Sequence, residues 1–363
     1  MTNPIQEAQS LGQSIWLDFI SRGLISTGQL KQLVEERVSG MTSNPTIFHK
    51  SVTMGTDYDG AIRAIVESDP GIDTKALYDR LIVEDIQMAA NVFLPVFDGS
   101  DGLNGLVSLE PTPELAYDTN GTMAEVRRLW GLVDRPNVMM KVPATPQGIP
   151  AIESLIAEGV NVNITLMFSM KHYEAVSHAY IRGIAKHSSP ERIVSVASFF
   201  VSRVDTYVDR ELERIGTEEA LALRGKAAIA NSKLVYRRFR EIFFGGEFAE
   251  QRKRGARVQR VLWGSTSTKN PAYPGLLYVE GLMGADTVNT VPLETLDGYR
   301  HHGRARPTLG ERMEEAEQVL AELGKVGVNL DAITEQLQED GMKAFADSYD
   351  QLMAALEEKR KQV

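Results

Sequence analysis

Cysteine is absent from the 363-residue chain, and this absence excludes several kinds of chemistry. Disulfides, thiolate nucleophiles, thiolate-held zinc and iron–sulfur clusters all require cysteine. The chain also lacks any apolar run near the roughly 18 residues that a membrane-spanning helix needs. Its first seven residues show no basic segment followed by an apolar core, the pattern of a secretory signal. We therefore expect a cytoplasmic protein that does not associate with membranes.

The chain also lacks a net positive charge, because its formal net charge is −10. General nucleic-acid binding needs a positive field to neutralise phosphates, so we expect no nucleic-acid partner. Any anionic ligand must instead meet local positive charge. The chain has no H-E-x-x-H zinc motif, no complete nucleophile elbow and no dinucleotide fingerprint. We expect chemistry carried by side chains, with no metal and no organic cofactor.

Short β-branched runs alternate with longer amphipathic stretches along most of the chain, which is the pattern of βα units around a parallel sheet. Eight such alternations fit a (β/α)8 TIM barrel better than an open sheet. The expected strands cover residues 15–20, 40–44, 103–110, 138–144, 160–166, 193–199, 258–265 and 286–292. Among the expected helices are residues 27–38, 75–94, 112–132, 146–157, 169–186 and 218–244.

The last part of the chain follows a different pattern. From residue 307 the sequence is polar and amphipathic, with expected helices over 309–323 and 330–361 and a break near Gly341. No linker rich in proline or serine separates this part from the rest. We interpret residues 1–363 as one barrel domain with barrel strands within about 15–292 and additional helices. Residues 307–363 would be a helical extension that covers one end of the barrel.

The fourth expected strand, Val138 to Ala144, carries one lysine, Lys141, in an otherwise apolar run. If the strand is buried, the ammonium group loses its water, and desolvation makes the neutral, nucleophilic amine more accessible. The alternative is a lysine at the strand end that points into solvent, since lysine is almost never fully buried. The octapeptide alone does not decide between the two.

Other expected strands carry polar residues where barrel strands are usually apolar. Asn161, Asn163 and Thr165 share one face of the fifth strand. On an open sheet this face would be wet. In a barrel, helices cover the outer face, so these polar groups must point inward and need partners or a ligand. The other polar positions are Asp18 in the first strand, Asn44 after the second, and Asn104, Ser108 and Glu110 in the third.

Each of these residues has a plainer interpretation as well. Asp18 suits a helix cap as well as a buried carboxylate, and Asn44 suits a turn. Arg203 and Lys269 follow the sixth and seventh strands, where cations suit a bound phosphate, but each also suits a wet helix turn or a solvated loop. Because TIM-barrel active sites are assembled from the carboxyl ends of several strands, the combination favours an active site.

With these residues in place, the sequence from Trp16 to Pro292 resembles the transaldolase family. The family's strand motifs occur in the same order as in this chain. They are Trp16-Leu17-Asp18, Thr42-Ser43-Asn44-Pro45, Val107-Ser108-Leu109-Glu110, Lys141-Val142-Pro143-Ala144-Thr145 and Asn161-Val162-Asn163-Ile164-Thr165-Leu166. The last of these is the most specific. The length and the long extension resemble a bacterial branch of the family.

The resemblance implies a role for each residue. Lys141 would form a Schiff base, Glu110 and Asp18 would act as acid and base, and Thr165 would position a catalytic water. Asn44 and Asn163 would hold the hydroxyl groups of a dihydroxyacetone unit. The remaining substrate-binding residues would be Thr42, Ser198, Phe200, Arg203, Ser267 and Lys269, with the phosphate held by Arg203, Ser267 and Lys269.

The implied activity is an exchange within the pentose phosphate pathway. A dihydroxyacetone unit would pass from sedoheptulose 7-phosphate or fructose 6-phosphate to glyceraldehyde 3-phosphate or erythrose 4-phosphate. The partners would be sugar phosphates, and the protein would be a monomer or a homodimer. The alternatives are an enzyme similar to fructose 6-phosphate aldolase, or a sugar-phosphate-binding barrel without catalysis. Glu110 and Phe200 favour transfer, because the aldolase branch has Gln and Tyr at these positions.

The chain departs from the family pattern at two positions. Phe199 stands where many relatives have proline, which affects the local backbone. Lys269 stands where others have arginine, so bidentate phosphate geometry is lost while the charge remains. Both departures concern phosphate binding more than the chemistry at Lys141.

Overall fold

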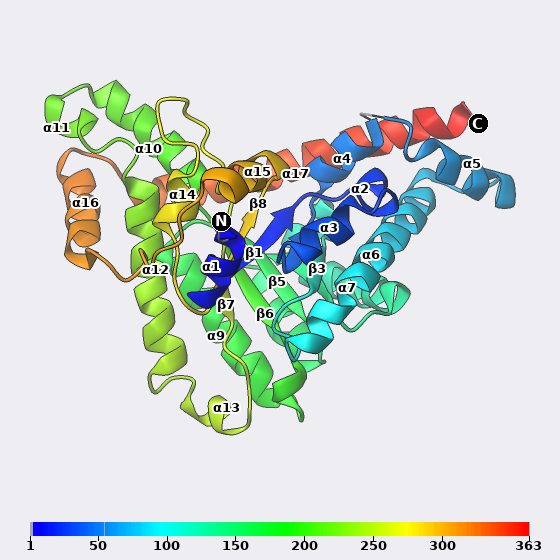
Figure 1. Ribbon diagram of the computed structural model, residues 1–363, viewed down its shortest axis with the longest axis horizontal. Coiled ribbons are helices and arrows are strands. Elements are labelled where there is room, and N and C mark those ends of the chain that lie inside the picture. Colours follow the sequence, from blue (N-terminus) through cyan, green and yellow to red (C-terminus); the bar gives the residue numbers. More distant parts are fainter. Residues whose placement is uncertain (1–2, 54, 363) are drawn as a thin grey trace.

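A closed barrel of parallel strands forms the centre of the molecule (Figure 1). The computed structural model describes residues 3–53 and 55–362, and in these residues eight strands pair in sequence order, with β8 returning to β1. The strands are β1 Gln13–Asp18, β2 Gly40–Thr42, β3 Leu106–Leu109, β4 Val138–Pro143, β5 Val162–Met167, β6 Ser195–Phe200, β7 Arg260–Gly264 and β8 Thr287–Val291. This confirms the predicted (β/α)8 barrel.

Helices surround the barrel and cover its outer face. They include α1 Pro4–Ser10, α2 Arg22–Ser26, α3 Gln29–Glu35, α4 Pro45–Thr53, α5 Asp59–Ser68, α6 Thr74–Gly99, α7 Thr119–Val133, α8 Gly148–Ala157, α9 Met170–Lys186, α10 Ser202–Ile215, α11 Glu218–Leu221, α12 Ala227–Phe244, α13 Ala249–Lys253, α14 Leu277–Gly281, α15 Leu293–His302, α16 Met313–Lys325 and α17 Leu330–Lys361. Two short 3-10 helices, Pro113–Tyr117 and Pro190–Arg192, complete them.

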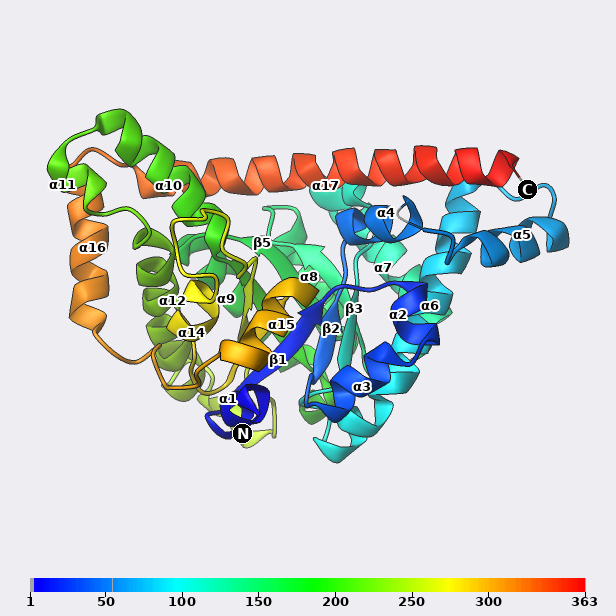
Figure 2. The same ribbon diagram turned by 45° about the horizontal axis from the view of Figure 1, so that its top comes forward.

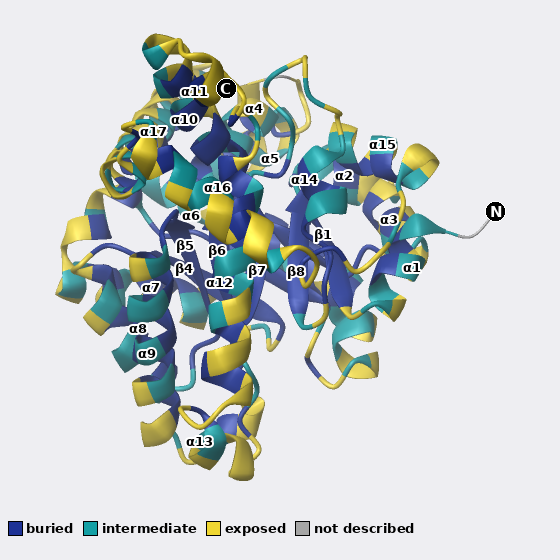
Figure 3. Ribbon diagram, turned by 90° about the vertical axis from the view of Figure 1, so that its left-hand side faces the viewer, coloured by how far each residue is buried: buried dark blue, intermediate teal, exposed yellow. Residues whose placement is uncertain are grey.

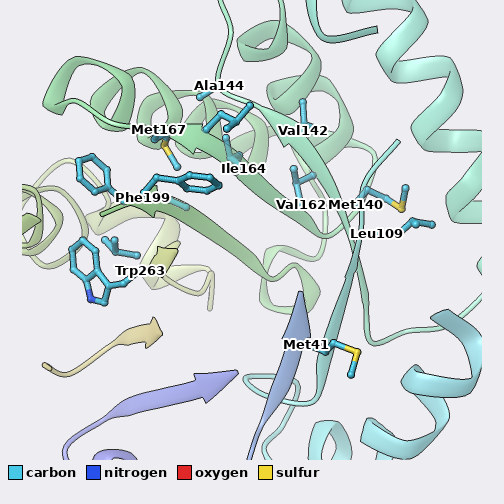
Figure 4. Packing of buried hydrophobic residues seen from close by; sticks show 14 of the residues in the cluster. Met41, Leu109, Met140, Val142, Ala144, Val162, Ile164, Met167, Phe199 and Trp263 are labelled. Atoms are coloured by element: carbon cyan, nitrogen blue, oxygen red, sulfur yellow. The ribbon is translucent and has the colours of Figure 1, made fainter. Parts of the chain in front are cut away.

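The main hydrophobic core lies between the strands and these helices. Figure 3 shows the strands almost entirely buried, whereas the outer helices expose one side. Outward-facing side chains such as Met140, Val162 and Trp263 fill this layer (Figure 4). Burial of this apolar surface at about 25 cal/mol per Å² is the main source of stability. The described part of the chain contains no helix that is long and apolar enough to cross a membrane.

A second, smaller apolar cluster fills the middle of the barrel. It consists of inward-facing residues: Trp16, Leu106, Met139, Val194, Val196, Leu262 and Val288. Polar inward residues lie on both sides of it, because side chains alternate along each strand. On β1, for example, Ser14 lies below the cluster and Asp18 above it. Gly40 leaves room for the indole of Trp16, since an added Cβ would lie 2.5 Å from it.

Several expected elements have different boundaries in the structure. The expected helix 27–38 corresponds to α3 alone, because Gly28, whose φ is +80°, separates α3 from α2, which lies before the expected range. The expected helix 218–244 is divided into α11 and α12, with Gly225 at φ +70° between them. The stretch 112–132 forms a 3-10 helix and then α7, which Asp118 caps through its side chain. These interruptions occur where a left-handed residue or a cap ends a helix.

The carboxyl-terminal extension forms α16 and α17, and α17 crosses the mouth of the barrel at the carboxyl ends of the strands (Figure 2). The expectation that the extension covers one end of the barrel is thus confirmed. The expected break near Gly341 is wrong, because α17 continues through it. Gly341 serves close packing instead, since a Cβ there would lie 2.9 Å from Leu166 Cδ2.

Candidate active site

A cavity of about 440 Å³ opens at this carboxyl-terminal mouth, where α17 partly covers it. Its wall contains most of the residues that the sequence singled out: Asp18, Thr42, Asn44, Lys141, Thr165, Ser198, Phe200, Arg203, Ser267 and Lys269. Glu110 and Asn163 stand behind this wall and hydrogen-bond residues that form it. All twelve predicted site residues therefore gather in one place. They come from strand ends and from the loops or helices that follow.

Lys141 lies inside the barrel, with 4% of its surface exposed. Its Nζ donates hydrogen bonds to Glu110 Oε2 at 2.9 Å and to the carbonyl oxygen of Ser43 at 3.0 Å. Burial raises the pKa of the Glu110 carboxyl above its ordinary value, against the opposing charge of Lys141. Since both groups are buried, this hydrogen bond lies away from bulk water, and the environment favours the protonated form of Glu110. The interpretation of Lys141 as a solvent-facing strand end is wrong.

Asp18 supplies a second carboxyl group at the end of β1. Its Oδ1 accepts a hydrogen bond of 2.6 Å from Thr42 Oγ1, which also lies 2.7 Å from Thr290 Oγ1. Burial raises the pKa of Asp18, while the hydrogen bond from Thr42 and the charge of Lys141 act against this rise. A carboxylate whose charge is only partly compensated has the properties of a general base.

The predicted inward polar face of β5 is present. Asn163 pairs in register with Lys141, and its side-chain amide connects β3 and β6. It donates to Ser108 Oγ at 2.9 Å and accepts from Ser198 Oγ at 2.6 Å. Thr165 lies next on this face, fully buried, and its Oγ1 has no hydrogen-bond partner among the described residues. A buried hydroxyl without a protein partner is suited to hold a water or a ligand.

Asn44 lies in the cavity wall and also stabilises the start of α4. Its Oδ1 accepts a 2.9 Å hydrogen bond from the backbone amide of Ile47 at the start of α4. The sequence left a turn and a site residue as alternatives, and both descriptions fit. The side-chain amide nitrogen remains available for a ligand in the cavity, because the capping bond uses only the oxygen.

Three cations gather at the outer end of the cavity. Arg203 at the start of α10 has no carboxylate within 4 Å among residues 3–53 and 55–362, and Lys269 Nζ donates to Ser267 Oγ at 2.6 Å. Partial burial lowers the pKa of Lys269, and the charges of Arg203 and Lys50 lower it further. Asp18 and Glu294 line the same cavity, but neither forms a salt bridge with these cations, so the cations remain able to bind an anion in a protein whose net charge is −10.

Sequence reasoning missed several residues of the cavity wall, among them Lys50, Thr290 and Phe345. Lys50 follows Thr46, another wall residue, at a spacing of four on α4. This spacing places both residues on one helix face. A prediction of α4 would therefore have indicated that Lys50 lies beside Thr46. Phe345 belongs to α17, and nothing in the local sequence marks it. Its ring centroid lies 5.8 Å from Lys141 Nζ.

Phe199 and Lys269, the two residues that depart from the family pattern, lie in different surroundings. Phe199 points away from the cavity and packs edge-on against Trp263, with ring centroids 6.1 Å apart (Figure 4). It therefore belongs to the outer core. Lys269 lies in the cavity wall, where it supplies charge to the cation group.

Two residues at strand ends beside the cavity have left-handed backbone conformations without being glycine. Leu166 has φ +59° and Ser265 has φ +54°. Such conformations destabilise the fold by about 1–3 kcal/mol each and cluster at functional sites. In contrast, the described residues include no group of three or more His, Asp or Glu side chains that could hold a metal ion.

The barrel and its cavity define a class of protein. It is a (β/α)8 barrel whose candidate active site places a buried amine beside two carboxyl groups, with a cationic anion site at the other end.

Comparison with known proteins specifies the class further. The family model described as Transaldolase/Fructose-6-phosphate aldolase matches residues 15–356. A protein named transaldolase from Thiobacillus denitrificans is 46% identical over 98% of this chain and 99% of its own length. Proteins of the same name from Thermobifida fusca and Mycolicibacterium paratuberculosis are each 44% identical, over 97% of this chain and 97% and 95% of their own lengths. The chain belongs to the transaldolase/fructose-6-phosphate aldolase family.

Proposed function

We propose that this protein is a transaldolase, which transfers a dihydroxyacetone unit from a ketose phosphate to an aldose phosphate through a Schiff base on Lys141. The donor would be sedoheptulose 7-phosphate or fructose 6-phosphate, and the acceptor glyceraldehyde 3-phosphate or erythrose 4-phosphate. The observation that carries the proposal is the buried pair of Lys141 and Glu110, 2.9 Å apart, with Lys141 lining the same cavity as Asp18.

The first half of the reaction uses Lys141 and Glu110. The neutral amine attacks the C2 ketone of the donor, and Glu110 in its acid form protonates the hydroxyl that leaves as water. The raised pKa of Glu110 supports this role, because burial favours the protonated form of the carboxyl. The unpartnered hydroxyl of Thr165 would orient the water. The product is a protonated imine that acts as an electron sink.

The second half uses Asp18 as base. Asp18 removes the proton of the C4 hydroxyl, the C3–C4 bond breaks, and its electron pair moves into the imine to form an enamine. The first aldose phosphate then leaves. The amides of Asn44 and Asn163 would hold the hydroxyl groups of the remaining three-carbon unit. The enamine carbon next attacks the carbonyl carbon of the second aldose phosphate, and water hydrolyses the resulting imine.

The cations at the outer end of the cavity would bind the phosphate group of each substrate. Arg203 and Lys269 carry the charge, Ser267 adds a hydroxyl, and Lys50 is a further candidate from α4. The two ends of the cavity thus match the two ends of a sugar phosphate: a carbonyl near Lys141 and a dianion near Arg203. This arrangement also provides local positive charge for an anionic substrate. The protein's location in the cytoplasm and its state as monomer or homodimer remain predictions.

The test is to trap the covalent intermediate. The protein is incubated with fructose 6-phosphate and borohydride, and the adduct is mapped by mass spectrometry. We expect an added mass on the peptide that contains Lys141 and none in Lys141→Ala. With erythrose 4-phosphate as acceptor, the wild type should form sedoheptulose 7-phosphate. No adduct on the wild type would refute the proposal, and release of dihydroxyacetone despite saturating acceptor would indicate an aldolase instead.

A further inference from the structure

One face of α17 is fitted to the mouth of the barrel. Gln338, Gly341 and Phe345 are three and four residues apart, so they share this face. The side-chain amide of Gln338 donates to the carbonyl oxygens of Ala144 at 3.1 Å and Leu166 at 2.9 Å, directly at the ends of β4 and β5. The helix is therefore bonded to the two strands that carry Lys141 and Thr165.

Further contacts hold this part of α17 close to the cavity. A hydrogen bond of 2.8 Å joins Thr46 of α4 to Ser348, and one of 2.6 Å joins Tyr207 of α10 to Asp340. Gly341 allows the helix backbone to approach Leu166. These contacts come from α4, from α10 and from the ends of β4 and β5. Figure 2 shows α4 and α10 at different places along α17. The position of the helix over the site is thus fixed by several independent interactions.

Phe345 is the residue that this arrangement brings to the cavity. Its side chain lines the wall, 3% of its surface is exposed, and its ring centroid lies 5.8 Å from Lys141 Nζ. The ring offers no acidic proton and occupies space beside the amine that water would otherwise fill. An apolar group at this point lowers the chance that a water or a solvent proton reaches a covalent intermediate on Lys141.

We propose that Phe345 is a specificity-determining residue that favours transfer over release of the three-carbon unit. This inference rests on the proposed transaldolase function and assigns part of it to the carboxyl-terminal extension. The enamine on Lys141 has two fates. Its carbon attacks the carbonyl of an aldose phosphate, forming a C–C bond while the carbonyl oxygen takes a proton. Alternatively, the same carbon takes a proton from solvent, and water then hydrolyses the imine to dihydroxyacetone and the free amine.

The experiment measures the ratio of dihydroxyacetone release to transfer, with fructose 6-phosphate as donor and erythrose 4-phosphate as acceptor. Phe345→Ala should raise this ratio by about tenfold, which corresponds to a change of about 1.4 kcal/mol in relative barrier height. Phe345→Leu keeps an apolar side chain of shorter reach, and it should raise the ratio by about threefold, or about 0.65 kcal/mol. If Phe345→Ala does not fold, the release-to-transfer ratio of Phe345→Leu alone tests the inference.

Leu352→Ala is the matched control. Leu352 is buried on the same face of α17, two turns beyond Phe345, but it does not line the cavity. Truncation there loosens helix packing without opening the site, so the release-to-transfer ratio should stay at the wild-type value. A ratio that rises equally in Leu352→Ala, or that stays unchanged in both Phe345 variants, would overturn the inference.

The same measurements separate this inference from the proposed function. A wild type that transfers and forms the Lys141 adduct, together with Phe345 variants of unchanged ratio, would refute only the role of Phe345. A wild type that neither transfers nor forms the adduct would refute both.

Discussion

Asp18 destabilises the folded protein in its charged form, because burial raises its pKa above the ordinary value. A carboxyl group with a raised folded-state pKa weakens stability as pH rises from the unfolded-state pKa through the folded-state pKa. The penalty is complete at higher pH and absent below the unfolded-state value. The proposed general base is therefore kept at the expense of stability, as is common for active-site groups.

Asp18→Asn should separate activity from stability. The Asn oxygen can still accept from Thr42, but the charge is removed, so transfer activity should fall by about 100-fold or more. The free energy of unfolding at pH 8 should rise by about 1 kcal/mol, and this gain should disappear as pH approaches 4. Urea unfolding at the two pH values measures it, with the exposed Asp350→Asn as control. A gain of equal size at both pH values would show that charge is not its cause.

At the residue scale, the sequence indicated which residues gather at the candidate site, but it did not indicate their contacts. Asp18, Glu110 and Lys141 stand out because charged residues in apolar strand runs need an explanation. The partner of each could not be predicted, since the Lys141–Glu110 distance depends on the register of β3 and β4. Phe345 escaped prediction because a buried phenylalanine in a helix has the same local pattern whether it faces a core or a cavity.

At the scale of elements, a contact between β1 and β2 helps to form the apolar layer inside the barrel beneath the cavity. The indole of Trp16 occupies the space beside Gly40, where three of its ring atoms would lie 2.5–2.7 Å from an added Cβ. A tryptophan from one strand and a glycine from the next thus complete one layer of the barrel interior. The site lies directly above this layer.

Gly40→Ala should destabilise the protein by about 1–3 kcal/mol, because overpacking a tight core forces side chains or backbone to shift. Gly60→Ala on α5 is the control, since no atom lies within 4 Å of its added Cβ and alanine favours helix by up to about 1 kcal/mol. Chemical denaturation of both variants measures the difference. Equal stability of Gly40→Ala and wild type would mean that the Trp16 ring moves at no cost.

The elements themselves were predicted well where periodicity is strong and less well at their ends. All eight strands lie within two or three residues of their predicted positions, because apolar β-branched runs are distinctive. Two expected helices proved to be divided, at Asp118 and at Gly225, and the expected helix 27–38 begins only after Gly28. The expected break at Gly341 is absent, since its packing against Leu166 depends on tertiary structure that no local pattern contains.

At the scale of the whole molecule, α17 links opposite sides of the barrel. Its first half contacts the mouth through Gln338, Gly341 and Phe345, whereas its last turns contact α5 and the segment before α6. There Lys359 pairs with Asp59 at 2.5 Å, and Arg360 donates to the carbonyl oxygen of Ile72 at 2.9 Å. The family match ends at residue 356, just before these last turns.

Removal of residues 357–363 should therefore affect stability more than activity. Loss of these partly exposed ion pairs should lower the free energy of unfolding by about 1–2 kcal/mol. Transfer activity should stay within about twofold of the full chain, because the residues at the mouth are retained and lie far away. Thermal unfolding and a transfer assay on the truncated chain test both expectations. A release-to-transfer ratio as high as that expected for Phe345→Ala would show that the last turns also hold the mouth closed.

The apolar layer around Trp16, Leu106, Met139 and Leu262 has a kinetic consequence. It closes the barrel interior below Lys141, so donor and acceptor must use the same opening and the same cationic end of the cavity. An acceptor that arrives early occupies the place of the donor, and a donor that arrives late occupies the place of the acceptor. Each substrate should therefore inhibit competitively against the other at high concentration, and the fastest turnover should occur when the two are balanced.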